Sequence, residues 1–338
     1  MTINADTKTQ RIPWIDVARG IAIILIIIGH CSGIPLTLRN LIFSFHVPAF
    51  FILSGYVYRK KNNNKITILK DIKHLISPYI ITVILILLLK LISNAIYDFD
   101  SLKRFVHSAL FGYGSTYENI QLIGAIWFLL AMFFARRLMD FIFDFTNDIK
   151  IQSLIAILFL IMGFSLSKYH FIPMNIDVAF VAVGYMYAGY LLKYFSLKFN
   201  ITTLIVMLMI WYSAYSCSTL SMSKRFYGIY YLNFLGAIAG SIILFYIAIY
   251  LSKINAIQKS LSFFGKHTIV ILCIHDLDWR LPFPLWQPYL RPYLNTPLYF
   301  PLTVICRFSF DIVLAILFVL ISKLIFDYYN RIRKFKLS

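Results

Sequence analysis

Charged residues are scarce in this 338-residue chain: Asp, Glu, Lys and Arg make up 14% of it, whereas an average soluble domain is about a quarter charged. Hydrophobic residues make up 60%, and the mean hydropathy is +0.77. This composition excludes an ordinary soluble domain and predicts an integral membrane protein whose length is used by membrane spans. We find no internal repeat. No cleavable signal peptide is expected, because the polar residues 1–13 lead directly into a full-length apolar segment.

Cysteine is also rare. The four cysteines lie in or beside apolar segments, without the paired spacing of a disulfide framework or a zinc site. We therefore expect them to be small buried hydrophobic residues, and the sequence predicts neither a metal site nor a permanently bound cofactor. Cys31, which follows His30, is a less favoured candidate nucleophile. The four are Cys31, Cys217, Cys273 and Cys306.

Acidic residues are few, 14 against 32 Lys and Arg, which gives a formal net charge of +18. An excess of this size is found in nucleic-acid-binding proteins, but here the basic residues lie in short runs between apolar segments. That distribution is typical of topology signals in membrane proteins and of contacts with anionic lipid. The lipid bilayer is therefore the expected surrounding, and no nucleic-acid partner is predicted.

Windows of apolar residues predict an all-α polytopic membrane protein with about ten transmembrane helices. Twenty-one of the 32 basic residues fall on the side of the N-terminus and eight on the other side, so both termini are predicted to be cytoplasmic. We divide the chain into a cytoplasmic N-terminal segment (1–13), a transmembrane domain (14–326) and a basic cytoplasmic tail (327–338). The predicted spans lie near residues 14–34, 41–58, 75–97, 121–135, 151–167, 174–192, 199–217, 227–252, 261–275 and 298–322.

The first predicted span is apolar but carries Asp16, Arg19 and His30. At about 100° per residue, these three lie near one side of a helix. Ionisable groups inside a membrane are costly and persist by facing a protein interior or a water-filled cavity. The stripe is therefore a candidate functional site. The alternative is an Asp16–Arg19 pair that neutralises itself, with His30 at the membrane interface.

The predicted topology places further polar residues at the outer membrane boundary. Because they share one level in the bilayer they could converge on one site, although polar residues are common at helix ends. Arg19 is predicted to lie deeper, about 16 Å from His30 along the helix axis. The residues at the outer level are His30, His46, Asp177, Tyr231, Asn233 and His275.

Two segments outside the predicted spans carry residues that suit a substrate. The outer segment 276–297 is rich in Pro and aromatic residues, and Trp279 with its aromatic neighbours could stack on sugar rings. An interfacial aromatic belt is the favoured alternative for this segment. On the cytoplasmic side, Lys60 and Lys61 are predicted orientation charges that could also meet a phosphate-bearing donor.

Two stretches of sequence carry specific motifs. In IDVARGIAIILIIIGH, ten residues separate Arg19 from His30, and FSFHVPAFFILSGYVYRKK carries His46 followed by Ser54 and Gly55. These motifs resemble those of the acyltransferase-3 family of integral membrane acyltransferases, with the fucose 4-O-acetylase-like group as the nearest in pattern. Weaker matches extend the resemblance over residues 11–276. They include Trp127, Asp177, Gly184, Asn233, Gly236, Gly265 and His275.

The resemblance implies an enzyme of the bacterial plasma membrane that transfers an acyl group, usually acetyl from acetyl-CoA, to a sugar hydroxyl of a polysaccharide or lipid-linked glycan. A hydroxyl is a poor nucleophile until its proton is removed, and histidine is the commonest residue for that task. We expect His30 to be the general base, with His46 orienting it or stabilising the oxyanion. Arg19 is expected to bind an anionic or carbonyl part of the donor, with Asp16 holding it in place.

The remaining candidates of this family pattern are assigned to substrate binding. Some members carry an extracytoplasmic hydrolase-like domain as well, and we expect the present membrane unit to act alone or with a separate partner. The substrate-binding candidates are Asp177, Tyr231, Asn233, His275, Trp127 and Trp279.

A transporter, such as a glycan flippase or a solute carrier, is the main alternative, since intramembrane charges suit transport equally well. Many transporters, however, show inverted repeats and broken helices in corresponding halves. This chain instead concentrates its charge in its first span. A ligand-sensing membrane domain is a third alternative, which the lack of a soluble output domain disfavours.

Overall fold

The computed structural model describes residues 11–60, 64–92, 99–113, 123–168, 172–196, 200–278 and 286–335. Within these ranges the fold is all-helical, as predicted, and the β-contact they contain is an isolated bridge between Ser221 and Phe226. The helices are α1 (Pro13–Gly29), α2 (Leu36–Phe43), α3 (His46–Tyr56), α4 (Asn64–Asp71), α5 (Ser77–Ile92), α6 (Phe99–Phe111), α7 (Trp127–Phe145), α8 (Ile149–Leu166), α9 (Ile176–Tyr194), α10 (Ile201–Cys217), α11 (Tyr230–Leu251), α12 (Asn255–Lys266), α13 (Thr268–Asp278), α14 (Gln287–Leu290) and α15 (Tyr299–Phe335). Short turns of other helix types are η1 (Ile72–Ile76, a π-helix), η3 (Gly124–Ile126), η4 (Pro173–Asn175), η5 (Met222–Lys224) and η6 (Arg291–Tyr293).

Several of these helices can cross a bilayer, and the protein is a multi-pass membrane protein. Each of the ten predicted spans overlaps helical structure, but the count of ten and the cytoplasmic placement of the termini stay predictions. α10 is apolar but shorter than the six segments that are long enough to span. Six segments in the described part of the chain are long and apolar enough to span: Leu36–Tyr56, Lys65–Ile92, Ile149–Leu166, Pro173–Tyr194, Tyr230–Leu251 and Tyr299–Tyr328.

One predicted span does not form a continuous helix. The segment near 261–275 contains the end of α12 and most of α13, which meet at His267. The backbone of His267 leaves the helical region (φ −110°, ψ 18°), and its N–H bonds to the carbonyls of Phe263 and Phe264. The break separates α12, which packs closely on α1, from α13, which carries His275.

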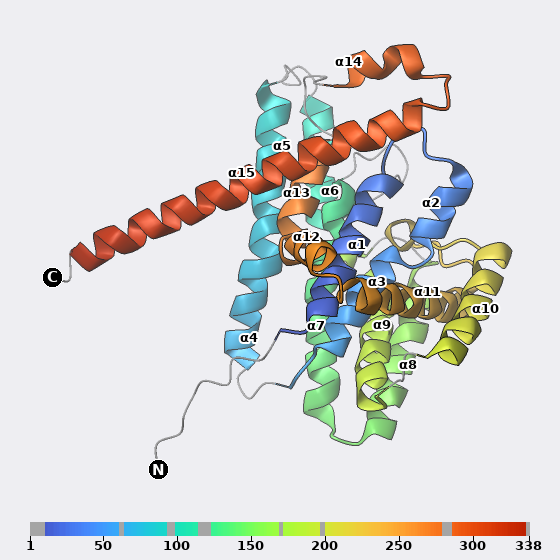
Figure 1. Cartoon of the computed structure of the whole chain (residues 1–338). Coiled ribbons are helices and arrows are strands. Elements are labelled where there is room, and N and C mark those ends of the chain that lie inside the picture. The colour runs from blue at the N-terminus through green and yellow to red at the C-terminus, as the bar shows by residue number, and fades with distance from the viewer. Residues whose placement is uncertain are drawn as a thin grey trace.

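Helix α1 lies at the centre of the molecule and packs against α2, α3, α11, α12, α13 and α15 (Figure 1). Glycine makes its contact with α12 unusually close. A Cβ atom on Gly20 would lie 2.1 Å from the carbonyl oxygen of Leu261, and one on Gly265 would lie 1.8 Å from that of Asp16. Small residues allow helix backbones to approach in this way in membranes. The contact fixes the backbone of α1 at the level of its Asp16–Arg19 pair.

Helix α15 runs obliquely across the other helices and then projects beyond them (Figure 1). Its first half packs on α13 through a stripe of residues four apart, whereas residues 320, 321 and 324–328 are exposed. The helix passes residue 326, where the tail was predicted to begin, and ends at Phe335. The buried stripe consists of Thr303, Arg307, Asp311 and Ala315.

The cysteines only partly meet the expectation of burial. Cys31 is buried, but Cys217 is exposed, and Cys273 and Cys306 are half-buried; all four are free thiols. Cys217 ends α10, a helix whose side chains are mostly exposed. An apolar helix surface of this kind faces lipid in a membrane protein, so a thiol there is apolar surface rather than core.

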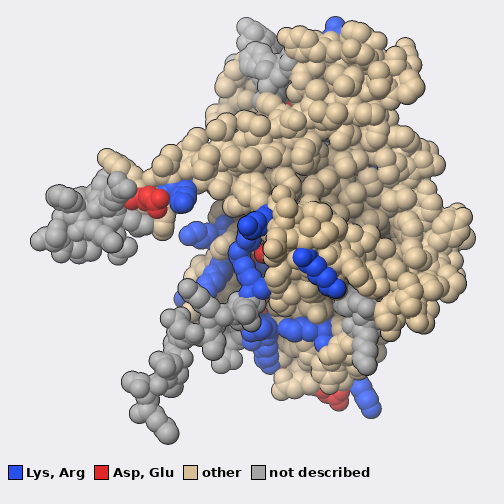
Figure 2. Space-filling view, viewed as in Figure 1, with Lys and Arg blue, Asp and Glu red and all other residues tan. Residues whose placement is uncertain are grey.

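On the face shown in Figure 2, basic side chains gather at one end of the molecule, around the start of α1 and α4, and few are seen at the opposite end. We call the end that carries Arg11, Arg59 and Lys193 the inner end, and the end that carries His30 the outer end. The asymmetry is the one expected of a cytoplasmic face at the inner end.

Candidate active site

Three histidines predicted at the outer level come together at the end of α1. His30 follows the last residue of α1, His46 is the first residue of α3, and His275 lies in α13. The rings of His30 and His275 are 5.6 Å apart between centroids. The Phe43 ring contacts the rings of His30 and His46, with centroid distances of 5.6 Å and 4.8 Å. We call His30, His46 and His275 the outer cluster.

The protonation of two rings in the cluster follows from their partners. The Nδ1 atoms of His30 and His46 each lie 2.7 Å from a carbonyl oxygen one turn back, at Ile26 and Ile42. A carbonyl oxygen only accepts hydrogen bonds, so in the neutral rings Nδ1 carries the proton and Nε2 keeps the lone pair. An imidazole held in this way presents a base at Nε2.

His275 differs because its partner is a carboxylate. Its Nδ1 lies 2.7 Å from Oδ2 of Asp311, and both side chains are almost fully buried. Four residues earlier on α15, Arg307 donates from Nε to Asp278 at 2.9 Å and from Nη1 to the carbonyl oxygen of His30 at 2.8 Å. A histidine–carboxylate hydrogen bond and an arginine–carboxylate ion pair thus join α13 to α15, and Arg307 also holds the end of α1.

Sequence analysis did not assign roles to Asp278, Arg307 or Asp311. Arg307 was placed inside a span without a role, and the two aspartates were not singled out. A usable signal existed: Arg307 and Asp311 are ionisable residues in the apolar segment 298–322, and intramembrane charges are functional candidates by default. Their partners on α13 depend on tertiary packing that a sequence pattern does not contain.

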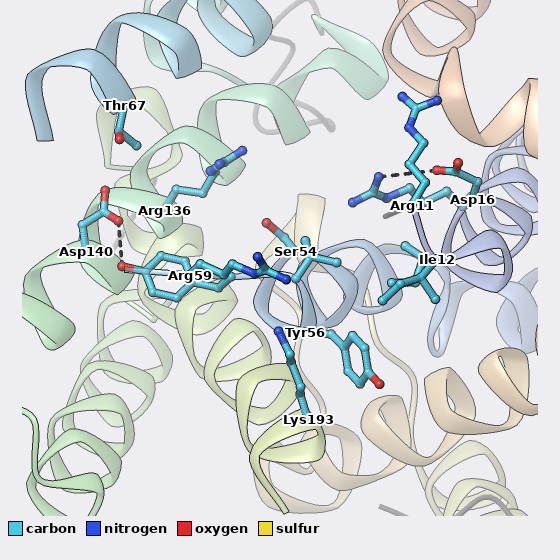
Figure 3. Close-up of a pocket in the computed structure, with 14 residues that line it drawn as sticks. Arg11, Ile12, Asp16, Ser54, Tyr56, Arg59, Thr67, Arg136, Asp140 and Lys193 are labelled. Carbon is cyan, nitrogen blue, oxygen red and sulfur yellow. Dashed lines mark hydrogen bonds and ion pairs between the residues drawn. The ribbon is translucent and has the colours of Figure 1, made fainter. Parts of the chain in front are cut away.

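The other end of α1 opens into an inner pocket of about 470 Å³. Asp16 and Arg19 both line it, and their charged groups are 4.0 Å apart, so they form the expected pair but not a tight one. Figure 3 shows further cationic side chains arranged around the same hollow. The cationic lining residues are Arg11, Arg19, Arg59, Arg136 and Lys193, against the carboxylates of Asp16 and Asp140. An excess of positive charge in a pocket favours an anionic ligand.

One wall of the inner pocket is held by a buried polar network. The Tyr58 hydroxyl donates to Asp140 at 2.8 Å, Arg137 bridges Asp140 and Asp71, and Arg136 lies 3.2 Å from Asp71. Burial raises the pKa of the Asp140 carboxyl, although the hydrogen bond from Tyr58 and the charge of Arg137 act in the opposite direction. Lys60 donates to the carbonyl of Phe143 beside this wall, and Lys61 lies outside the described residues.

Two predicted substrate-binding residues have structural partners instead. Asp177 is 1% exposed, and its oxygens accept from Nε and Nη2 of Arg225 at 2.8 and 3.3 Å. The Asn233 amide donates to Ser218 at 2.9 Å and to the carbonyls of Thr219 and Tyr227. These contacts tie residues 218–227 to α9 and α11. Among the described residues, neither Asp177 nor Asn233 forms a hydrogen bond with the outer cluster.

The remaining predicted residues are scattered. Tyr231 is 73% exposed on α11. Trp127 is buried at the start of α7, where its carbonyl accepts from Asn175 at 3.4 Å. Trp279 lies outside the described residues. Within the described ranges, no three His, Cys, Asp or Glu side chains converge as metal ligands.

The fold and the site define a multi-pass membrane protein with a basic pocket at one end of α1 and, at the other end, a histidine cluster in which His46 and His275 are buried and His30 is half-buried. The family model Acyl_transf_3, an acyltransferase domain, matches residues 12–322. The chain therefore belongs to the acyltransferase-3 family and is a membrane acyltransferase. No curated protein and no solved structure matches it.

Proposed function

We propose that this protein is an O-acyltransferase of the bacterial plasma membrane that moves an acetyl group from acetyl-CoA to a hydroxyl of a cell-envelope or exported polysaccharide sugar. The fucose 4-O-acetylase-like group is its proposed place within the family. The observation that carries the proposal is the arrangement of α1, which has a cationic pocket at Arg19 and a histidine cluster at His30, eleven residues and about 16 Å further along the helix.

The inner pocket supports an acyl-CoA donor. Coenzyme A carries several phosphate charges at one end and its thioester at the end of a long, thin pantetheine arm. Arginine stays charged when it is buried and presents a fork of donors that suits phosphate oxygens. With the phosphates at Arg19 and its neighbours, the arm can extend along α1 and bring the thioester towards His30.

The outer cluster supports acyl transfer to a hydroxyl. In the proposed reaction Nε2 of His30 removes the proton of the acceptor hydroxyl, and the oxygen attacks the thioester carbonyl. His46, whose ring contacts Phe43 as that of His30 does, is proposed to orient His30 or to stabilise the developing oxyanion. Asp16 is proposed to hold Arg19, consistent with its position in the pocket.

The proposal is tested with purified protein in nanodiscs supplied with radiolabelled acetyl-CoA and cell-envelope glycan. Wild type is compared with His30→Ala and Arg19→Ala, and with matched controls at exposed positions, His74→Ala and Arg291→Ala. We expect label in the glycan with wild type and both controls, and loss of label with the two site variants. All five proteins must first elute as the same monodisperse species.

Two results would change the account. Transfer that survives in His30→Ala would leave the enzyme class intact and remove the general base. If wild type transfers nothing, while glycan crosses the bilayer of proteoliposomes that contain the protein, a flippase replaces the acyltransferase.

A further inference from the structure

The three histidines of the outer cluster are not equivalent. His30 and His46 hydrogen-bond through Nδ1 to neutral carbonyls, whereas His275 hydrogen-bonds to the carboxylate of Asp311. An imidazolium in a buried site needs a counter-ion, because an unpaired buried charge costs several kcal/mol. The protonated form of His275 has such a counter-ion in the carboxylate of Asp311, 2.7 Å from its Nδ1.

The neighbouring charges strengthen this difference. Oδ1 of Asp311 is buried and accepts no hydrogen bond from the described residues. Within these residues, the hydrogen bond of the Asp311 carboxylate is therefore the one between Oδ2 and His275. Arg307 is already neutralised by Asp278 at 2.9 Å. Protonation of His275 therefore leaves two balanced pairs side by side, His275 with Asp311 and Arg307 with Asp278. Among the described residues, the titratable groups that face this part of α13 include His30 and Cys31 at the end of α1, Tyr79 from α5, Arg307 and Asp311 from α15, and Cys273, Asp276 and Asp278 on α13 itself.

Environments that separate two titratable groups in this way assign the acid and the base of a reaction. We propose that His275, held by Asp311, is the general acid that protonates the leaving thiolate, and that Asp311 is its positioning residue. The inference rests on the proposed acyltransferase reaction and adds to it a second catalytic histidine, acting beside the base His30.

In the proposed step, His30 takes the proton of the acceptor hydroxyl at Nε2, and the C–O bond of the new ester forms at the thioester carbonyl. The C–S bond then breaks, and the electron pair that leaves with sulfur takes the proton from Nε2 of the His275 imidazolium, giving free thiol. The proton now on His30 returns to His275, whose ring is its neighbour at 5.6 Å between centroids, and the resting pair with Asp311 is restored.

The leaving group provides a selective test. A coenzyme A thiolate in a buried site benefits from protonation, whereas a 4-nitrothiophenolate is stable enough to leave as an anion. His275→Gln and Asp311→Asn are therefore compared with wild type using acetyl-CoA and S-(4-nitrophenyl) thioacetate as donors and cell-envelope glycan as acceptor. Asp327→Asn, exposed on the same helix as Asp311, and the exposed His74→Gln are matched controls.

With acetyl-CoA we expect both variants to lose about 100-fold in kcat, within the range of general acid catalysis. With the activated thioester their kcat should be close to that of wild type, while His30→Gln should be impaired with both donors. The pH profile of kcat with acetyl-CoA gives an independent readout. In Asp311→Asn its alkaline limb should move to lower pH, because the amide cannot stabilise the imidazolium, and its acidic limb should stay.

Equal losses with the two donors, or an unmoved alkaline limb, would overturn the assignment and leave Asp311 with a structural role. Wild-type rates in both variants would overturn it as well. If wild type itself transfers no label from acetyl-CoA, the proposed function fails, and this inference fails with it.

Discussion

Substitution of Arg19 by Gln tests the donor pocket most specifically. Arg19 lies 4.0 Å from Asp16, which is too far for a hydrogen bond, and its side chain is 32% exposed towards the pocket. Arg136, in the same pocket, is drawn to Asp71 at 3.2 Å. The hydrogen-bonding groups of Arg19 are therefore better placed than those of Arg136 to bind a phosphate of the donor.

The expected effect can be worked out from this geometry. A hydrogen bond to a charged group contributes about 1.5–3 kcal/mol, and about 1.4 kcal/mol corresponds to a tenfold change in an equilibrium constant. Because the side chain is partly exposed, solvent screening favours the lower limit. We expect Arg19→Gln to raise the KM for acetyl-CoA by about 10-fold, with a smaller change in kcat.

The assay measures the initial rate of label transfer over a range of acetyl-CoA concentrations, together with the Kd of free coenzyme A. The rise in KM should shrink as salt is added, since screening weakens the contact that the mutation removes. Arg291→Gln, at an exposed position of η6, should leave KM unchanged. An unchanged KM and Kd in Arg19→Gln with a large loss in kcat would refute the reasoning, because Arg19 would then act in the chemical step.

Three further predictions concern the scaffold. Gly265→Ala should lower the Tm and destabilise the protein by about 1–3 kcal/mol through overpacking, because its Cβ would meet the carbonyl of Asp16. Gly184→Ala, whose Cβ would meet mainly flexible side chains, should lower the Tm less. Equal Tm values for the two variants would contradict the close α1–α12 contact. Arg225→Met should lower the free energy of unfolding by about 3–5 kcal/mol, because it leaves Asp177 buried without its charge partner. Adding Asp177→Asn should restore part of the lost Tm, and no recovery in the double variant would argue against the Arg225–Asp177 pair. Burial raises the pKa of Asp140 above its ordinary value of 3.8, so the folded protein binds this proton more tightly than the unfolded chain does. The protein therefore loses stability as pH rises from the ordinary pKa to the raised one. Asp140→Asn should flatten this part of the profile of Tm against pH, and an unchanged profile would contradict the raised pKa.

The polar stripe of α1 was predictable because it follows from helix geometry alone. Three residues on one side of an apolar helix had to face protein, and Asp16 and Arg19 do line one pocket. The common level of His30, His46 and His275 at the outer boundary also indicated that they could converge, although it did not require them to. Both inferences rest on period and depth, which a sequence contains.

Partner choice could not be predicted in the same way. Asp177 and Asn233 share the outer level with the histidines, but Arg225 and a turn at residues 218–227 hold them. Arg225 was placed in a loop without a role, and its left-handed backbone (φ 54°) is a tertiary feature. Likewise, the pairing of His275 with Asp311 depends on the oblique course of α15 across α13, which periodicity does not specify.

The central claim is that donor and acceptor meet from opposite ends of α1. It is tested most directly in sealed proteoliposomes in which the protein has one orientation, verified by labelling a cysteine introduced at Lys65, which is exposed near the start of α4. Radiolabelled acetyl-CoA is supplied only on the side of the inner end, and cell-envelope glycan only on the other side. The account predicts label in the glycan across the bilayer, and none when the donor is supplied on the outer side. Transfer that requires donor and glycan on the same side would contradict it.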